Sequence, residues 1–400
     1  MRYRLILFLI LGIDAFVLFY ETSHISISSS GASLIYNESS FLEFLVTKSL
    51  EFFGHNDFGL RFVFITMHIL SAVLIYLISA KYLKSQRNRL WLVLTFVLLP
   101  GVVSSAVMVN HAGFIIFGLL LYLYLEEKLP KILMNLLLFS YAIMDVGFVY
   151  LFLGLSLYYF FNKKYKDSLY NISLFFLSSY LYGFDIYGFP RGHFLDTIGI
   201  YAAIFNPIIF LYIFYVLYRR YLINKKDKLW YIASTALLFS LLVSFRQRIE
   251  IEHFAPYLII ALPLAAQTFV SSYRVRLKEH RKGYRTIFVI SFILLIANTL
   301  IVFFNKDLYL ILDNPKKNFA YNMHIAKDLA KALKVDGYNC VDTNEKMQKR
   351  LRFYSIGKCR ENRLEELPYD SKEDADVTIR YKNKTLYKAT VTKLNNKQSN

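Results

Sequence analysis

The feature that most constrains this chain is the succession of apolar runs along its first three quarters. We delimit eleven segments, at roughly 4–20, 61–80, 90–107, 112–125, 131–144, 146–161, 169–184, 202–218, 229–245, 256–271 and 286–304. A helix needs about 20 mostly apolar residues to cross a bilayer. Because 56% of the 400 residues are hydrophobic, one or two soluble cores could not bury this much apolar surface. The sequence therefore predicts a polytopic α-helical membrane protein with about 11 spans.

The basic residues suggest an orientation for these spans. Lysine and arginine concentrate in every second connection, as in 81–89, 219–228 and 274–285, and are sparse in the connections between them. Cytoplasmic loops carry such an excess, so we expect the N-terminus inside and the C-terminus outside. We therefore attribute the net charge of +18 to loops that flank a lipid bilayer, and we expect no nucleic acid as a partner. The main outside segments are then the loops at 21–60, 185–201 and 246–255 and the C-terminal tail.

The first apolar run follows Met-Arg-Tyr-Arg and lacks a small-residue cleavage site. We therefore expect an uncleaved first span, in which Asp14 makes a polar contact inside the helix bundle.

Two domains are expected, a multispan domain over 1–304 and a small soluble α/β domain over 305–400. Apolar residues at helical spacing predict a helix over 318–334, and NEKMQKRLRFY predicts a second one. ADVTIRY and TLYKATVTKL alternate as strands do. The chain's two cysteines, Cys340 and Cys359, both fall in this tail. They form a disulfide if the tail lies in an oxidising compartment, or remain two buried thiols.

The stretch FRQRIEIEHFAP, residues 245–256, places ionisable side chains between two apolar runs. Arg246 and Arg248 could recognise a phosphate with their guanidinium forks, or form i,i+4 ion pairs at an ordinary helix end. An extended backbone would aim these arginines, Glu250 and Glu252 at one face. The glutamates could orient the arginines or bind a sugar hydroxyl, and His253 could titrate near neutral pH. A solvated loop is the alternative for these three residues.

Other outside positions are candidates for substrate contact. Asp145 lies between two apolar runs, where an acid is costly and is a functional candidate, although aspartate is also a good N-cap. The loop DIYGFPRGHFLD contains Asp185, Arg191, His193 and Asp196. His193 and Asp196 could bind a divalent cation as a cofactor, but two ligands are weak evidence for a metal site. No cluster of cysteine and histidine shows a metal-ligand spacing.

Three stretches resemble the C-superfamily of lipid-dependent glycosyltransferases, especially protein-mannosyltransferase-like and aminoarabinose-transferase-like members. They are FGHNDFGLRFVFITMHILSAVLIYLISAKYL, LLPGVVSSAVMVNHAGFIIFGLLLYLYL, and FRQRIEIEHFAP with the PYLIIALP that overlaps its end. The resemblance covers roughly residues 1–270. The chain is also similar to a group of multispan membrane proteins of ε-proteobacterial type.

The resemblance implies a bacterial inner-membrane enzyme that moves a sugar from a polyprenyl-phosphate donor to a periplasmic glycan, lipid or protein. A carboxylate would take the acceptor's proton, and cations would hold the departing phosphate. The family places that acid in the first outside loop, where Gly31 stands in this chain. Glu38 or Glu21 would then supply the proton-accepting carboxylate, or the family's acidic position aligns elsewhere in this loop, or the reaction has been lost. The alternatives are a non-catalytic membrane protein that binds a lipid carrier or a glycan-assembly partner, and a polysaccharide polymerase or ligase.

Overall fold

A computed structural model describes residues 2–37, 40–183, 192–371 and 374–393. The chain forms two compact units. The helical unit comprises Met1–Phe16, Phe64–Ala106 and Asn110–Thr299, and the mixed unit comprises Val17–Val63, Val107–Val109 and Leu300–Asn400. The sequence-based boundary at residue 304 follows the last apolar run, whereas the mixed unit also takes in two segments that interrupt the helical unit, Val17–Val63 and Val107–Val109.

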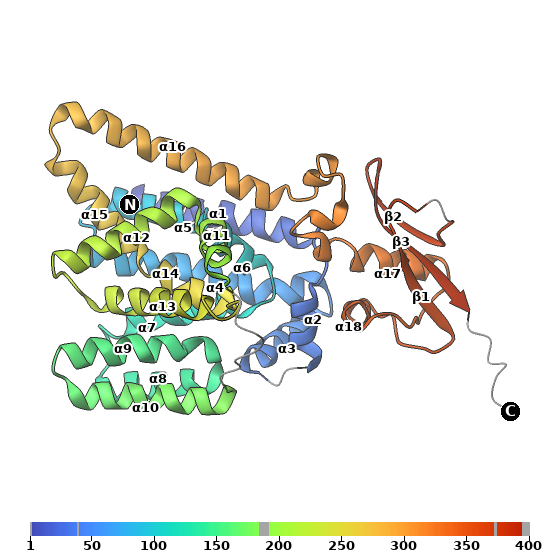
Figure 1. Ribbon diagram of the computed structural model, residues 1–400, viewed down its shortest axis with the longest axis horizontal. Coiled ribbons are helices and arrows are strands. Elements are labelled where there is room, and N and C mark those ends of the chain that lie inside the picture. The colour runs from blue at the N-terminus through green and yellow to red at the C-terminus, as the bar shows by residue number, and fades with distance from the viewer. Residues whose placement is uncertain (1, 38–39, 184–191, 372–373, 394–400) are drawn as a thin grey trace. The chain divides into compact units, whose positions relative to one another are not determined.

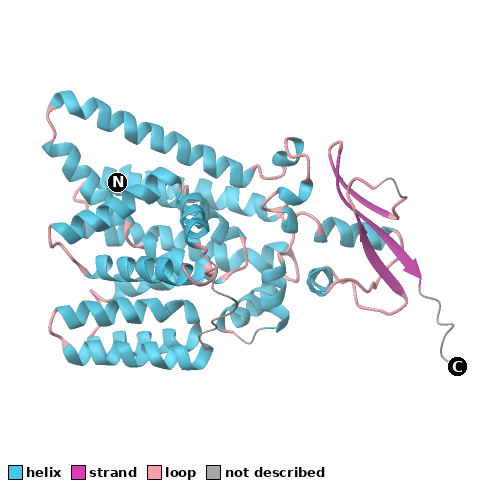
Figure 2. Ribbon diagram, viewed as in Figure 1, coloured by secondary structure: helices cyan, strands magenta, loops and turns pink. Residues whose placement is uncertain are grey.

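Helices make up the helical unit (Figure 2). Those wholly or mainly within it are α1 (Arg2–Thr22), α4 (Asp57–Ile78), α5 (Gln86–Val97), α6 (Pro100–Val107), α7 (His111–Leu125), α8 (Lys131–Met144), α9 (Val149–Phe161), α10 (Tyr165–Tyr182), α11 (Phe194–Phe205), α12 (Pro207–Leu222), α13 (Lys228–Ser244), α14 (Ile251–Ile259), α15 (Leu262–Val275) and α16 (Lys278–Phe303). Two short 3-10 turns join them, η1 (Ser79–Lys81) after α4 and η2 (Val146–Phe148) before α9.

The ends of these helices follow local sequence signals. The Asp227 side chain accepts from the Trp230 amide at 3.0 Å and caps the start of α13. Pro207 occupies the first turn of α12, where its missing N–H costs no hydrogen bond. Such caps and prolines divide the apolar sequence into helices that are shorter than its hydropathy suggests.

The predicted number of spans is wrong. In the described part of the chain, four helical stretches are long and apolar enough to cross a membrane, or six if two bent pairs each count as one span. Helix α7 has 15 residues and so extends about 22 Å at 1.5 Å per residue, short of a hydrocarbon core of about 30 Å. The pairs α5–α6 and α11–α12 bend by 60° and 107°. The inside and outside assignments, which assumed strict alternation over 11 crossings, lose that basis.

Close helix contacts define the interior of the helical unit (Figure 1). Helix α9 packs against α10 and α13, and α14 packs against α7 and α13. A Cβ atom at Gly154 would lie 2.8 Å from the Ile232 Cα, so α9 and α13 approach at a distance that only glycine allows. The Tyr257 hydroxyl donates to the Gly147 carbonyl at 2.5 Å and accepts from the Leu151 amide at 3.0 Å. These contacts fix the start of α9 against α14.

The mixed unit combines helices with a small sheet. Its main elements are α2 (Ser29–Asn37), α3 (Phe41–Phe53), α17 (Ala326–Val335), α18 (Glu345–Phe353), β1 (Asn362–Leu367), β2 (Val377–Tyr381) and β3 (Lys384–Lys393), with 3-10 turns at Asp307–Leu310, Pro315–Lys317 and Tyr321–Met323. The sheet is antiparallel in the order β1-β3-β2. Its core joins apolar residues of α17, α18 and the strands, including Leu329, Leu333, Leu351 and Ile379.

The local predictions for the tail are largely confirmed. Both predicted strands and the NEKMQKRLRFY helix form. The helix predicted over 318–334 begins only at Ala326. The Asn318 side chain explains this late start, since it accepts from the Ala320 amide at 2.9 Å and donates to the Asn305 carbonyl at 2.8 Å. Cys340 and Cys359 are joined as a disulfide.

A buried charged network lies within the mixed unit. The Arg61 side chain is 1% exposed and donates to the Val107 carbonyl at 2.7 Å and the Ser26 carbonyl at 2.9 Å. Asp57 accepts from the Tyr354 hydroxyl at 2.7 Å and pairs with Lys327 at 2.7 Å. Burial, followed by the negative charge of Asp57, raises the pKa of Tyr354 well above its ordinary range. Tyr354 therefore stays protonated and remains a hydrogen-bond donor.

Candidate functional site

Asp145 is a buried carboxylate at a break between two helices of the helical unit. It follows the last residue of α8, and its side chain is 1% exposed. Its Oδ1 atom accepts from the Gly147 amide at 2.7 Å and caps the 3-10 turn η2. A Cβ atom at Gly147 would lie 2.1 Å from the Ile115 side chain, so Ile115 packs against this turn more closely than a side chain at position 147 would allow. The predicted N-cap role of Asp145 is therefore present, although it occupies only one of the two carboxylate oxygens.

The second carboxylate oxygen of Asp145 binds His111, the first residue of α7. The distance from His111 Nδ1 to Asp145 Oδ2 is 2.6 Å, and the His111 side chain is 22% exposed. An imidazole held through one ring nitrogen by a carboxylate is fixed in tautomer and orientation. The buried acid thus positions a histidine that solvent can reach.

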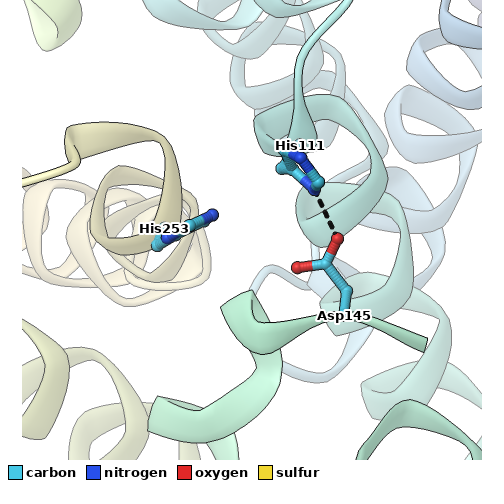
Figure 3. A group of neighbouring side chains, drawn as sticks. All are labelled: His111, Asp145 and His253. Atoms are coloured by element: carbon cyan, nitrogen blue, oxygen red, sulfur yellow. Dashed lines mark hydrogen bonds and ion pairs between the residues drawn. The ribbon is translucent and has the colours of Figure 1, made fainter. Parts of the chain in front are cut away.

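His253, in the first turn of α14, completes a group of three. Its ring centroid lies 5.6 Å from that of His111 at an interplanar angle of 76°. His253 Nδ1 lies 3.3 Å from Glu250 Oε2, and the His253 side chain is 17% exposed. Figure 3 shows the two imidazoles and the Asp145 carboxylate facing one another from three separate elements. One ligand atom from each side chain lies within 4.8 Å of the other two.

The chemistry open to this histidine–aspartate cluster follows from its composition. Two imidazoles and one carboxylate can bind a divalent metal ion, because histidine and aspartate are both common ligands. Imidazoles and carboxylates are also the groups that most often transfer protons in enzymes. Protonated imidazoles can also bind an anionic group such as a phosphate.

The structure brings together two sequence candidates, Asp145 and His253, and adds one that the sequence reasoning did not select. His111 directly precedes an apolar run, in NHAGF. That position beside an apolar run is the same signal that singled out Asp145, so His111 could have been selected on equal grounds. What joins the three residues is the packing of α14 against α7 and η2.

Arg246 and Arg248, in the connection that leads to His253, are exposed. Arg246 and Arg248 lie between α13 and α14, and His253 follows them in the first turn of α14. Arg246 is in a turn and Glu252 is in the helix, with only 247–250 between these elements. The stretch is therefore not extended throughout, and the condition under which its four charges would share one face is not met.

The remaining predicted contact residues fall elsewhere or outside the described residues. His193 Nδ1 lies 3.3 Å from Asp196 Oδ2, at the start of α11, and the Asp196 side chain is 73% exposed. Such an exposed ion pair contributes little stability. Glu38, Asp185 and Arg191 lie outside the described residues.

The first-loop acid Glu21 and the two arginines belong to different compact units. Glu21 lies in the last turn of α1 and belongs to the mixed unit, whereas Arg246 and Arg248 belong to the helical unit. At Gly31, a Cβ atom would lie 3.0 Å from the Val109 Cβ. An acidic side chain at this position would therefore have to displace its neighbours.

A second histidine–aspartate pair lies deeper in the helical unit. His68 Nε2 lies 2.7 Å from Asp14 Oδ2, and the two side chains are 2% and 10% exposed. The polar contact expected for Asp14 is confirmed. Because both groups are buried and bind each other, we interpret this pair as a link between α1 and α4, although His68 Nδ1 has no hydrogen-bond partner.

The mixed unit contains one strongly perturbed histidine. His324 is 3% exposed, and its Nδ1 atom lies 2.8 Å from the Tyr309 hydroxyl. Burial, followed by the positive charge of Lys306, lowers the pKa of His324 to about 3. His324 is therefore neutral at physiological pH and acts as a structural hydrogen-bonding group.

No protein-family model matches the chain, and no curated protein shows significant similarity to it. The resemblance to lipid-dependent glycosyltransferases therefore stays a prediction from the sequence.

Proposed function

We propose that this chain is a multi-pass protein of the bacterial inner membrane that transfers a sugar from a polyprenyl-phosphate donor to a periplasmic acceptor. The observation that carries the proposal is the histidine–aspartate cluster, His111, Asp145 and His253, at the start of α14 beside the connection with Arg246 and Arg248. Apolar helices could hold the polyprenyl chain, while these ionisable groups contact the phosphate.

The chemistry of such a transfer needs cationic or metal-bound groups at the phosphate. The acceptor hydroxyl attacks the anomeric carbon, the bond from that carbon to the phosphate oxygen breaks, and negative charge grows on the departing phosphate. Arg246 and Arg248 can neutralise that charge with bidentate hydrogen bonds. A base must take the hydroxyl proton, and Glu21 and Glu38 are our candidates for it.

The disulfide supports the proposed side of the membrane. Disulfides persist in oxidising compartments such as the bacterial periplasm, and Cys340–Cys359 lies in the mixed unit. This agrees with a periplasmic location for the C-terminal part of the chain.

One observation favours the non-catalytic alternative, a protein that binds the lipid carrier without transferring its sugar. The expected acid is replaced by Gly31, which is buried beside Val109 and Ser28 in a space that leaves little room for a side chain. A carrier-binding protein would need the phosphate contacts but no proton acceptor.

The test uses purified protein in lipid nanodiscs and a radiolabelled sugar linked to polyprenyl phosphate. We expect the wild type to bind the donor and to release or transfer its sugar. We expect the double variant Arg246→Ala, Arg248→Ala to bind at least about 10-fold more weakly, which corresponds to about 1.4 kcal/mol.

The matched control is Arg274→Ala, Arg276→Ala, two exposed arginines with the same spacing at the other end of the α14–α15 pair. Equal losses in both double variants would indicate general electrostatic attraction and refute a specific phosphate contact. Donor binding with no sugar release under any acceptor condition would select the non-catalytic alternative. No donor binding by the wild type would refute both.

A further inference from the structure

The geometry points to a divalent transition-metal site formed by His111, Asp145 and His253 in the helical unit. The three residues come from the start of α7, the end of α8 and the first turn of α14, and one ligand atom of each lies within 4.8 Å of the others. Metal binding at this site does not require the proposed function. The role that we assign to the ion, which is to hold the donor phosphate, does rest on it.

The ligand set selects a class of ion. Imidazole nitrogens suit Zn²⁺, Fe²⁺, Co²⁺ and Ni²⁺, whereas Mg²⁺ and Ca²⁺ prefer oxygen ligands alone. Two histidines and one carboxylate leave at least one coordination position open, which is the arrangement of catalytic rather than structural metal sites. We therefore infer an ion of the Zn²⁺ type with an open position for a water or a phosphate oxygen.

The distances fit such a site after small side-chain movements. Metal bonds to histidine and carboxylate are about 2.0–2.2 Å long, so two ligands of a tetrahedral ion lie about 3.4 Å apart. His111 Nδ1 and Asp145 Oδ2 are 2.6 Å apart, the distance of a shared proton. A metal ion would replace that proton and increase the distance between the two atoms by about 0.8 Å. His253, whose ligand atom lies within 4.8 Å of the other two, would approach by up to about 1.4 Å.

The surroundings hold the ligands in place, as metal sites require. Asp145 keeps its other oxygen on the Gly147 amide at 2.7 Å, which fixes the plane of the carboxylate. His253 Nδ1 lies 3.3 Å from Glu250 Oε2, so a proton on Nδ1 would direct Nε2 toward the ion. A carboxylate that orients the far nitrogen of a ligand histidine is a common outer-shell feature of metal centres.

The exposure of the three side chains gives the ion access to a substrate. Asp145 is 1% exposed and lies at the base of the cluster, whereas His111 and His253 are 22% and 17% exposed. An ion held between them would present its open position on the solvent-reachable side. There it could bind one phosphate oxygen and stabilise the negative charge that develops when the sugar leaves.

The experiment measures metal binding directly in the full-length protein. The protein is purified in detergent with an affinity tag free of histidine, stripped with a chelator, and dialysed against buffered Zn²⁺. Bound zinc is then counted by elemental analysis. We expect about one ion per chain, as for a single site. We expect at least about 100-fold weaker binding for His111→Ala, Asp145→Asn and His253→Ala, because each removes a ligand.

The matched control is His280→Ala, an exposed histidine in α16. It should bind zinc as the wild type does. Zinc should also raise the thermal unfolding temperature of the wild type and not that of the three ligand variants. If the ligand variants unfold at the same temperature as metal-free wild-type protein, their loss of zinc binding is not caused by a loss of fold.

If a ligand variant does not fold, X-ray absorption spectroscopy of the zinc-loaded wild type decides the question. Scattering from two imidazole rings with one oxygen ligand supports the site, and a zinc environment without imidazole overturns it. Failure to retain zinc, or equal retention by the ligand variants, also overturns it.

Donor binding measured with and without zinc separates the two proposals. Zinc binding without an effect on donor affinity leaves the metal site standing and refutes its phosphate role. Sugar transfer by fully metal-free protein supports the proposed function and refutes a role for the metal in it.

Discussion

Replacement of Arg61 by methionine is the sharpest test of how the mixed unit is held together. The Arg61 side chain is 1% exposed. Its Nε donates to the Val107 carbonyl at 2.7 Å, one terminal nitrogen to the Ser26 carbonyl at 2.9 Å, and the other lies 3.4 Å from Asp57 Oδ1. Methionine fills a similar space but donates no hydrogen bond. The variant Arg61→Met therefore leaves the carbonyls of Val107 and Ser26 without these donors and removes one of the partners of Asp57.

The expected loss follows from these contacts. A buried acceptor that loses its donor costs about 1–3 kcal/mol, which gives about 2–6 kcal/mol for the two carbonyls. Asp57 keeps Lys327 and Tyr354 as partners, so its share is smaller. Removing one partner of a buried ion pair costs about 3–5 kcal/mol in general. We therefore predict that Arg61→Met lowers the free energy of unfolding by about 3–5 kcal/mol.

The assay is denaturant unfolding in detergent micelles, followed by circular dichroism. The control is Lys48→Met, which removes an ion pair with Glu51 in which both side chains are more than half exposed. Such pairs contribute about 0–1 kcal/mol. A loss for Arg61→Met no larger than that for Lys48→Met would refute the reasoning, because it would mean that the buried guanidinium contributes no net stability.

Three further predictions concern other parts of the chain. Because the pKa of His324 is lowered to about 3 by burial and is about 6.5 in the unfolded chain, stability should fall as pH drops from about 6.5 toward 3. The loss should be about 2 kcal/mol at pH 5, and His324→Gln should flatten this part of the curve; an unchanged slope would assign it to other groups. Gly154→Ala should destabilise by about 1–3 kcal/mol through overpacking, measured by thermal unfolding, whereas Gly199→Ala, with open space around it, should not; equal behaviour would contradict the close helix contact. Non-reducing mass spectrometry should show a linked Cys340–Cys359 peptide, and reduction should cost about 3 kcal/mol; two free thiols in membranes prepared without reductant would contradict the pairing.

The sequence predicted local structure better than it predicted the number of spans. Strands β2 and β3 and helix α18 follow directly from residue alternation and helical spacing, which depend on neighbours in the chain. The number of spans depends on where each helix ends and how it bends. Pro100 and Pro207 are visible in the sequence, but bends of 60° and 107° at these breaks are decided by what the helices pack against.

The candidate site shows the same division. Asp145 and His253 are marked by the sequence because each is an ionisable residue beside an apolar run. Their relation to His111 is not visible there, because 34 residues separate His111 from Asp145 and His253 lies far along the chain. Gly147 contributes in a way that only the structure explains, since its amide binds the Asp145 carboxylate and its lack of a side chain leaves room for Ile115.

The sequence by itself determined that the chain is rich in apolar helices, that its tail contains two paired strands, and that its charges gather at the ends of apolar runs. These properties arise from interactions over a few residues. The tertiary structure decided which helices are long enough to cross a membrane, that Arg61 is buried with Asp57 and Tyr354, and that His111, Asp145 and His253 meet. The reason is physical: burial and the convergence of side chains depend on contacts between segments distant in the chain, and these form only when the helices pack.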